Sequence, residues 1–308
     1  MKDILTTIIA KKAEEIALQK QMVSQTQLEQ NVMDTEQRFS MREALAASST
    51  GIIAEFKRRS PSKGWINKTA ETTTIVPHYA AAGASALSIL TDSSFFGGDL
   101  KDIRSVREAV NLPILRKDFI IDEYQLYQAK IIGADAVLLI AAALSVAQYM
   151  ALKKEAHALG LEVLLEIHSV QELEYIDNDV EMIGVNNRNL GTFSTTVDNS
   201  FALIEELQKK LSVLPPAPHG KQPVFISESG LSDTATIQAL REVGFRGFLI
   251  GESFMRSDTP GATLAQFIEQ LSNAPVKCDS THPQQDKREQ VKTSCNNLQS
   301  NNKTTVSC

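Results

Sequence analysis

The folded body of this chain lacks cysteine. The 308-residue sequence holds three cysteines, Cys278, Cys295 and Cys308, and all three follow residue 275. A body without cysteine cannot depend on a disulfide framework, and it offers no thiol nucleophile. We therefore expect a cytoplasmic protein.

Long hydrophobic runs and targeting signals are also missing. The longest apolar run, residues 136–147, is shorter than the ~18 residues that a membrane-spanning helix needs. The N-terminal segment has no uninterrupted apolar core followed by a cleavage site, as a signal peptide would have. We expect no membrane partner and no secretion.

An excess of positive charge is absent as well. The formal net charge is −6 and the sequence pI is about 5.5, so the surface as a whole is not built to attract nucleic acid. The five histidines show no spacing typical of metal ligands, and we expect no metal site. If the protein binds an anion, local groups must do so.

What the chain does contain is a regular alternation of strands and helices between residues 51 and 272. Short β-rich runs are bounded by glycine, proline, asparagine or aspartate, and amphipathic stretches separate them. Several helical stretches end in glycine just before the next strand, which is typical of a left-handed helix cap. The eight predicted strands are residues 52–57, 86–91, 113–118, 136–141, 162–167, 182–187, 223–229 and 247–251.

This rhythm predicts an α/β protein with a (β/α)8 TIM barrel. An open doubly wound sheet usually carries a glycine-rich dinucleotide turn after its first strand, and no G-x-G-x-x-G motif occurs here. We assign residues 49–274 to the barrel, as the catalytic domain. Residues 275–308 are rich in polar side chains and almost devoid of large apolar ones, which predicts a disordered tail.

Residues 1–48 form a predicted helical extension in front of the barrel. Apolar side chains recur there at three- and four-residue spacing, and such a stripe must be buried against something. The extension either packs on the outside of the barrel or covers one of its mouths, and the sequence alone does not separate the two. The stripe consists of Ile4, Leu5, Ile8, Ile9, Ala13 and Ile16.

The segment of residues 51–64 is the most informative in the chain. An apolar strand carries Glu55 and Lys57 two residues apart, so both side chains face the same side. A strand rarely places opposite charges on its buried side without a chemical reason, although a structural ion pair at a strand end is the alternative. The Ser-Pro-Ser-Lys-Gly turn that follows supplies hydroxyls, N–H groups and positive charge suited to a phosphorylated ligand.

Polar side chains also follow several other predicted strands. Active sites of barrels form at the C-terminal ends of the strands, so these side chains should meet across one cavity. Packed carboxylates and ammonium groups shift one another's pKa, and can supply a proton donor and an acceptor near neutral pH. We expect Asp118 to be structural. The candidate residues are Glu55, Lys57, Lys117, Glu166, Asn186, Arg188, Glu228 and Ser229.

The last two predicted strands indicate a phosphate site. Each ends with a glycine beside a polar residue, in Ser-Glu-Ser-Gly of residues 227–230 and Gly-Glu-Ser-Phe of residues 251–254. The loops after strands seven and eight of such barrels commonly hold phosphate through backbone N–H groups at a short helix.

The chain resembles indole-3-glycerol phosphate synthase, a carboxy-lyase family of tryptophan biosynthesis. The matching segments span residues 51–256 in the order that the family has them, and the N-terminal helix with RFSMREAL also looks like the extension of the family. The matches are IIAEFKRRSPSKG, ILRKDFIIDEYQ, LLEIHS, IGVNNRNL, FISESG and FLIGESFM.

The resemblance implies closure of 1-(2-carboxyphenylamino)-1-deoxyribulose 5-phosphate to indole-3-glycerol phosphate, with loss of CO₂ and water and without a cofactor. It implies that Lys117 is the general acid that protonates the carbonyl oxygen. Lys57 would hold the anthranilate carboxylate and serve in dehydration. Glu166 and Glu55 would share the roles of base and charge stabiliser, in a division that the sequence leaves open.

The remaining implied contacts fall into three groups. Asn186, Arg188, Glu228 and Ser229 match positions that orient the sugar hydroxyls and the reacting carbons. Glu252 stands where some relatives carry serine, so a hydroxyl is lost there while the N–H remains. The implied phosphate contacts are Ser60, Gly230, Gly251 and the backbone of Glu252, and the implied apolar wall around the aromatic ring is Phe96, Phe119, Leu138 and Ile250.

Two alternatives to this function stay open from the sequence. One is a class I aldolase or isomerase, in which Lys57 or Lys117 forms a Schiff base with a ketose phosphate. The other is a sugar-phosphate sensor without catalysis, although a sensor has no need of both lysines and three glutamates. In each case the partner is a small sugar phosphate. The oligomeric state is unknown, with a monomer slightly favoured.

Overall fold

Eight parallel strands close into a barrel, as the sequence predicts. The computed structural model describes residues 4–32, 39–189, 191, 194–218 and 220–273, and the predicted tail lies outside these ranges. The strands neighbour one another in the order β1-β10-β9-β8-β7-β6-β5-β4. They are β1 (Ile52–Phe56), β4 (Ala86–Leu90), β5 (Ile114–Lys117), β6 (Ala136–Ile140), β7 (Glu162–Ile167), β8 (Met182–Asn186), β9 (Val224–Glu228) and β10 (Gly247–Ile250).

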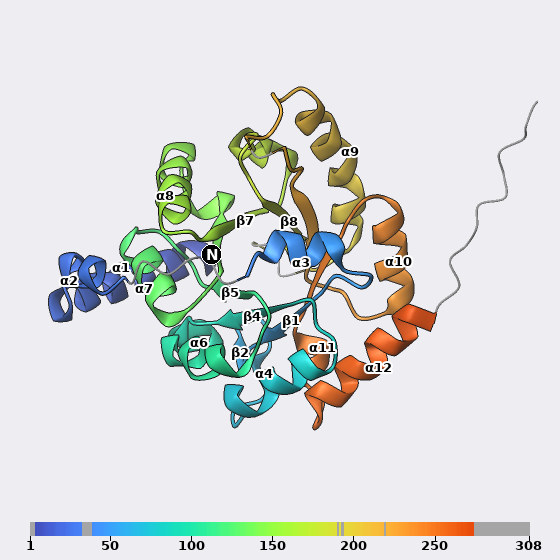
Figure 1. Ribbon diagram of the computed structural model, residues 1–308, viewed down its shortest axis with the longest axis horizontal. Helices are drawn as coiled ribbons and strands as arrows, with labels where there is room; N and C mark the ends of the chain where they lie inside the picture. The colour runs from blue at the N-terminus through green and yellow to red at the C-terminus, as the bar shows by residue number, and fades with distance from the viewer. Residues whose placement is uncertain (1–3, 33–38, 190, 192–193, 219, 274–308) are drawn as a thin grey trace, which may run out of the picture. The chain divides into compact units, whose positions relative to one another are not determined.

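Helices surround the barrel, and most of them connect one strand to the next (Figure 1). Gly83, Gly133, Gly160 and Gly244 all have positive φ angles at helix ends, which confirms the predicted left-handed caps. The helices after β1 are α4 (Thr72–Ala81), α5 (Ser93–Phe96), α6 (Leu100–Val106), η1 (Arg107–Ala109), α7 (Tyr124–Ile132), η2 (Ala141–Ala143), α8 (Val146–Ala158), η3 (Val170–Tyr175), α9 (Asp198–Ser212), α10 (Thr234–Glu242), α11 (Glu252–Met255) and α12 (Pro260–Asn273).

Two local features add detail to the predicted barrel. Residues 170–175 form a 3₁₀ helix, and Ser169 and Glu172 close a capping box at its start. The loop after β1 folds into a small antiparallel hairpin of β2 (Arg59–Ser60) and β3 (Gly64–Trp65), which holds Ser60 in a fixed place.

The strands are buried on both faces, which explains their nearly continuous apolar sequences. Side chains that point outward pack against the ring of helices, and side chains that point inward fill the barrel. The inner cluster includes Ile53, Leu115, Leu164 and Ile226. This inner packing fills the part of the barrel away from the C-terminal strand ends.

Three helices precede the barrel: α1 (Ile4–Met22), α2 (Gln25–Asn31) and α3 (Met41–Ala47). Met41 and Leu45 of α3 belong to the inner apolar cluster. Glu162, the first residue of β7, accepts hydrogen bonds from the backbone N–H groups of Met41 at 2.6 Å and Arg42 at 3.0 Å. Helix α3 therefore closes the N-terminal end of the barrel.

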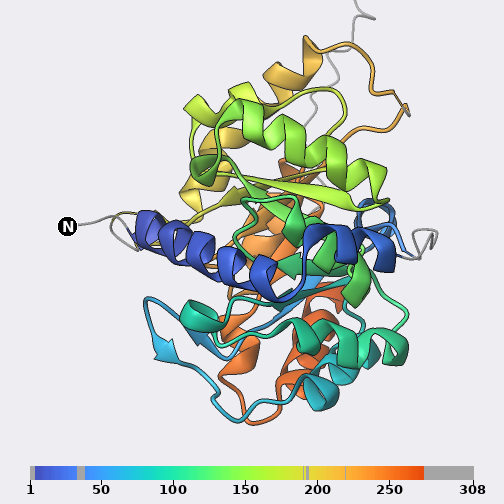
Figure 2. The same ribbon diagram turned by 90° about the vertical axis from the view of Figure 1, so that its left-hand side faces the viewer.

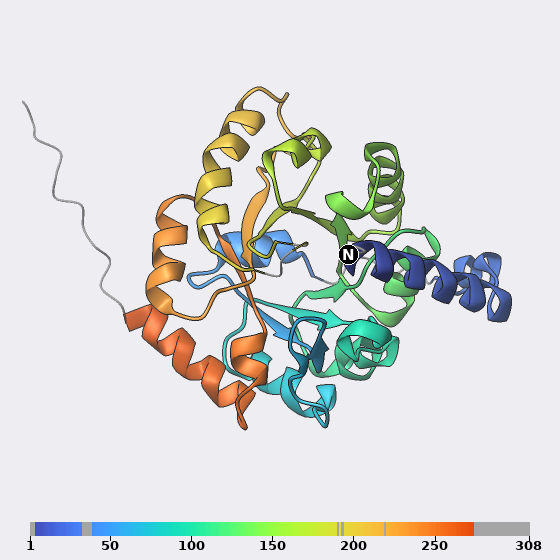
Figure 3. The ribbon, with the colours of Figure 1, turned by 180° about the vertical axis from the view of Figure 1, so that it is seen from behind.

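Helix α1 lies at the opposite end from α3. Figure 2 shows the first turn of α1 at the end where the β2–β3 hairpin projects, and Figure 3 shows α1 in front of the barrel from that side. The extension thus reaches both mouths of the barrel, a combination that neither alternative from the sequence included. Among the residues that the structure describes, no helix is both long enough and apolar enough to span a membrane.

Candidate active site

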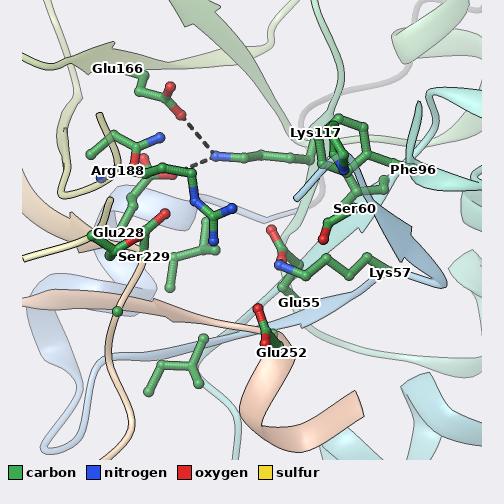
Figure 4. Close-up of a pocket in the computed structure, with 18 of the residues that line it drawn as sticks. Glu55, Lys57, Ser60, Phe96, Lys117, Glu166, Arg188, Glu228, Ser229 and Glu252 are labelled. Carbon is green, nitrogen blue, oxygen red and sulfur yellow. Dashed lines mark hydrogen bonds and ion pairs between the residues drawn. The ribbon is translucent and has the colours of Figure 1, made fainter. Parts of the chain in front are cut away.

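A cavity of about 500 Å³ opens at the C-terminal end of the barrel. All sixteen candidate site residues line it, although they come from separate strands and loops (Figure 4). Their individual roles stay predictions. They are Glu55, Lys57, Ser60, Phe96, Lys117, Phe119, Leu138, Glu166, Asn186, Arg188, Glu228, Ser229, Gly230, Ile250, Gly251 and Glu252.

Lys117, the last residue of β5, reaches across the cavity between two carboxylates (Figure 4). Its Nζ lies 3.1 Å from Glu166 Oε2 and in closer contact with Glu228 Oε2. The three side chains come from β5, β7 and β9, which are alternate strands of the barrel and so contribute to one interior layer. The ion pairs hold the ammonium group inside the cavity.

The three groups have very different proton affinities. Burial favours the neutral amine of Lys117, but the charges of Glu228, Glu166 and Glu55 outweigh it and raise the pKa of the lysine. Burial and the repulsion from Glu166 raise the pKa of Glu228 to about 7, against the opposing effect of Lys117. For Glu166, burial is outweighed by Lys117 and then His168, so its pKa is lowered. The cluster therefore combines a charged lysine, an ionised glutamate and a glutamate that titrates near neutrality.

Two glycines make room for these carboxylates. A Cβ added at Gly184 would lie 2.2 Å from Glu228 Oε1, and one added at Gly251 would lie 2.4 Å from Glu55 Oε1. Neither distance is possible between real atoms, so a side chain at either position would displace a glutamate.

Glu55 and Lys57 form an ion pair that lines the cavity. The pairing matches the structural alternative from the sequence. However, its position within the cavity also leaves the Lys57 ammonium beside any bound ligand, since the lysine side chain keeps 16% of its surface exposed.

Several groups in the lining of the cavity are suited to an anion. Ser60 is buried, and its Oγ has no hydrogen-bond partner among the described residues. Ser229 and Gly230 both have positive φ angles, which turns the backbone sharply after β9 and is unusual for a serine. Gly251 precedes the short helix α11, and Glu252 in that helix pairs with Arg256 at 2.7 Å.

Arg188 and Asn186 are held at another side of the cavity. The Asn186 side-chain oxygen accepts a hydrogen bond from the Arg188 backbone N–H at 3.0 Å. The Arg188 guanidinium donates to the Ser62 hydroxyl at 2.5 Å, which joins the loop after β8 to the hairpin after β1.

Apolar side chains form another part of the cavity lining, an apolar wall. The rings of Phe96 and Phe119 lie 6.0 Å apart between centroids. Ile4, Leu5 and Ile8 of α1 complete the wall, although our sequence analysis did not assign them to the site. The apolar stripe of the extension was the available signal, but it did not specify which surface the stripe covers.

Two further cationic side chains line the cavity, Lys63 and Arg256. Lys63 stands in the Ser-Pro-Ser-Lys-Gly turn that the sequence indicates as an anion site, whereas Arg256 was missed because it lies beyond any strand end and carries no local signal. The Asp118 carboxylate lies 3.0 Å from Lys12 and 3.1 Å from Arg116, and the residue also borders the cavity, so its structural role stays a prediction.

Solved structures that resemble this fold include barrels with distant sequences. The tryptophan synthase α subunit from Legionella pneumophila has a TM-score of 0.55 at 14% identity, over 78% of this chain and 100% of that one. The chain of a tryptophan synthase α₂β₂ complex from Pyrococcus furiosus has a TM-score of 0.51 at 13% identity, over 73% of this chain and 98% of that one. At this identity the likeness shows the fold alone.

Sequence relatives are much more similar. An indole-3-glycerol phosphate synthase from Bacteroides thetaiotaomicron is 58% identical over 271 residues, which are 88% of this chain and 100% of the relative. One from Bordetella pertussis is 42% identical over 275 residues, which are 87% of this chain and 100% of the relative. The family model described as indole-3-glycerol phosphate synthase matches residues 5–269. The chain therefore belongs to the indole-3-glycerol phosphate synthase family of carboxy-lyases.

Proposed function

We propose that this cavity converts 1-(2-carboxyphenylamino)-1-deoxyribulose 5-phosphate to indole-3-glycerol phosphate, CO₂ and water, with Lys117 as general acid and Glu166 as general base. The observation that carries the proposal is the Lys117 ammonium, 3.1 Å from Glu166 and within the same cavity as Lys57 and Ser60. The substrate needs an acid, a base, a cation for its carboxylate and a site for its phosphate. The cavity offers one group for each need.

Lys117 serves in the ring-closing step. A carbon of the aromatic ring attacks the ketone carbon, a C–C bond forms, and the ammonium of Lys117 gives its proton to the carbonyl oxygen. The carboxylate on the attacked ring carbon then leaves as CO₂, and the electron pair of the broken bond restores the aromatic ring. A lysine that stays protonated in the free enzyme suits this role, since the raised pKa of Lys117 keeps it charged.

Glu166 serves in the loss of water. The hydroxyl group formed from the ketone leaves as water, and a base removes the proton whose loss creates the indole double bond. Because its pKa is lowered, Glu166 is ionised and ready to accept this proton. Lys57 lies across the cavity to hold the anthranilate carboxylate and to protonate the leaving hydroxyl, with Glu55 as its partner.

The polar and the apolar parts of the cavity lining suit the phosphate and the aromatic ring of the substrate. The Ser60 hydroxyl and the turns at Gly230 and Gly251 offer donors to the phosphate. Lys63 and Arg256 add positive charge to the cavity. Phe96 and Phe119 enclose the aromatic ring at the apolar wall.

The aldolase alternative fits the cavity less well. A lysine that forms a Schiff base must lose its proton to become a nucleophile. Lys117 is paired with two carboxylates that favour its protonated form. Borohydride reduction in the presence of a ketose phosphate should therefore leave no sugar attached to Lys117.

The decisive experiment is a turnover assay with Lys117→Met. We expect the wild type to generate indole fluorescence and one CO₂ per substrate, and the variant to lose about 10²–10⁴-fold in kcat, the usual contribution of a general acid. A substrate analogue should still bind the variant, because the lost proton acts in the transition state. Lys153→Met is a matched control, since Lys153 is also buried and paired, with Asp177, but does not line the cavity. Near-normal turnover by Lys117→Met would rule out this lysine as the acid.

A further inference from the structure

His168 is a buried titratable residue next to the cavity that the mechanism above leaves unused. It follows β7 and stands two residues after Glu166, but it does not line the cavity itself. Its Nε2 lies 3.4 Å from Glu166 Oε1 and its Nδ1 lies 3.8 Å from Glu172 Oε2. Both ring nitrogens are buried, and neither makes a hydrogen bond of good geometry within the described part of the chain.

We propose that His168 is a positioning residue that holds the Glu166 carboxylate ionised and aimed into the cavity. The inference rests on the proposed role of Glu166 as the base. Lys117 binds Oε2 of Glu166 from the cavity side, and His168 faces Oε1 from behind. The carboxylate is therefore held between two groups that can each carry positive charge.

The backbone around His168 is fixed by two further elements. Asn199 in α9 donates its side-chain N–H groups to the carbonyl oxygens of His168 at 3.2 Å and Asn186 at 3.0 Å. Glu172 in η3 accepts from the backbone N–H of His168 at 2.5 Å. These contacts join the ends of β7 and β8, so the backbone that carries the imidazole is held in place beside Glu166.

The surrounding charges favour the protonated imidazole. Burial lowers the pKa of His168, but Glu172 in η3, Glu166 in β7 and Glu228 in β9 together outweigh it, and the net pKa is raised. The imidazolium in turn lowers the pKa of Glu166, in addition to the effect of Lys117. A packing residue of similar size and no charge would fill the same space without this effect.

The test is the pH profile of kcat in His168→Asn and His168→Gln. An opposite charge at this distance lowers a carboxylate pKa by about one unit or more, so its loss should move the acidic limb of the profile upward by about one pH unit. On that limb kcat should fall about tenfold, while the plateau and KM stay near the wild-type values. A uniform loss of kcat at every pH, with the limb unmoved, would overturn the proposal in favour of simple packing.

His157→Asn is the control for charge loss at a partly buried histidine. His157 in α8 also faces two carboxylates, Asp179 at 3.4 Å and Glu181 at 2.8 Å, but it does not line the cavity. Its removal should lower stability and leave the acidic limb in place. A shift of the limb in this control equal to that in His168→Asn would also overturn the proposal.

A second measurement does not depend on turnover or on the His168 variants. NMR titration of the His168 ring protons in the wild type and in Glu166→Gln should show a lower His168 pKa in the variant, by about one unit, because the coupling between two charges is reciprocal. An unchanged His168 pKa would refute the pairing. If the wild type made no indole product, the proposed function would fail, while this titration would still decide whether His168 and Glu166 are coupled.

Discussion

Two buried lysines, Lys12 and Lys117, sit among carboxylates in this protein, and only one of them faces the cavity. Lys12 in α1 lies 3.0 Å from each of Glu15, Asp92 and Asp118. Lys117 in β5 pairs with Glu166 and Glu228. In both cases the carboxylates outweigh burial and raise the pKa of the lysine.

The two clusters differ in whether their charged groups are fully paired within the protein or remain available to a ligand. Asp118 also accepts hydrogen bonds from Arg116 and Thr91, and Asp92 caps α5, so the oxygens around Lys12 are used within the protein. In contrast, Glu228 Oε1 has no partner among the described residues, and the Lys117 side chain keeps 13% of its surface exposed toward the cavity. A raised lysine pKa therefore does not by itself distinguish Lys117 from Lys12, whereas the place of Lys117 in the lining of the cavity does.

The largest effect we expect is on stability, in Lys12→Met. Removal of one partner from a buried ionic cluster leaves uncompensated charge and typically costs about 3–5 kcal/mol. The free energy of unfolding from urea titration should fall by that amount, while kcat changes less than tenfold. KM should rise, because α1 carries part of the apolar wall.

Lys11→Met is the control for Lys12→Met. Lys11 pairs with Glu14 on the surface, where both side chains are more than half exposed, so its removal should cost no more than about 1 kcal/mol. Equal stability losses in the two variants, or a loss of turnover in Lys12→Met as deep as that in Lys117→Met, would erase the distinction between the clusters.

The two clusters should also differ in how their stability depends on pH. Because the pKa of Glu228 is raised to about 7 in the folded state, its contribution to stability is complete below the ordinary glutamate pKa and is lost as the pH rises through 7. The stability of Glu228→Gln relative to wild type should therefore increase between pH 5 and pH 8, by about 1–3 kcal/mol at roughly 1.4 kcal/mol per pKa unit.

Asp118→Asn provides the opposite sign. Although burial raises the pKa of Asp118, Arg116 and Lys12 outweigh it and lower that pKa, so its contribution is present above the ordinary aspartate pKa and is lost only as the pH falls further. The penalty of this substitution should be constant between pH 5 and pH 8. Parallel pH profiles for the two variants in chemical denaturation would contradict the assigned pKa directions.

The smallest effect concerns Trp65, the only tryptophan in the sequence. It lies in β3, is 50% exposed, and belongs to the hairpin that carries Ser60. We expect binding of a substrate analogue to change its emission by reordering the hairpin around the phosphate. Unchanged emission at saturation would indicate that the hairpin does not rearrange when the phosphate binds.

The strands were predictable because each has a local cause. Strands of a parallel barrel are buried on both faces, so they appear in the sequence as apolar runs, and all eight were located to within about two residues. Polar residues at the ends of such runs stand out, and for that reason the polar candidates at the strand ends could be named from the sequence, whereas the apolar wall was implied only by the family resemblance. Arg256 and the apolar residues of α1 could not be named, since their place in the site depends on how distant segments pack.

Helix α1 shows most clearly what the sequence determines and what only the tertiary structure decides. The spacing of its apolar residues determined that the segment is a helix with one apolar stripe. The alternation of strand and helix patterns over residues 51–272 determined the barrel against which this helix packs. The buried residues of α1 are Leu5, Ile8, Lys12 and Ile16, while Ala13 of the expected stripe is exposed. Only the fold could decide this, because the cost of burying a lysine is offset only where separate segments bring carboxylates within 3.0 Å of it.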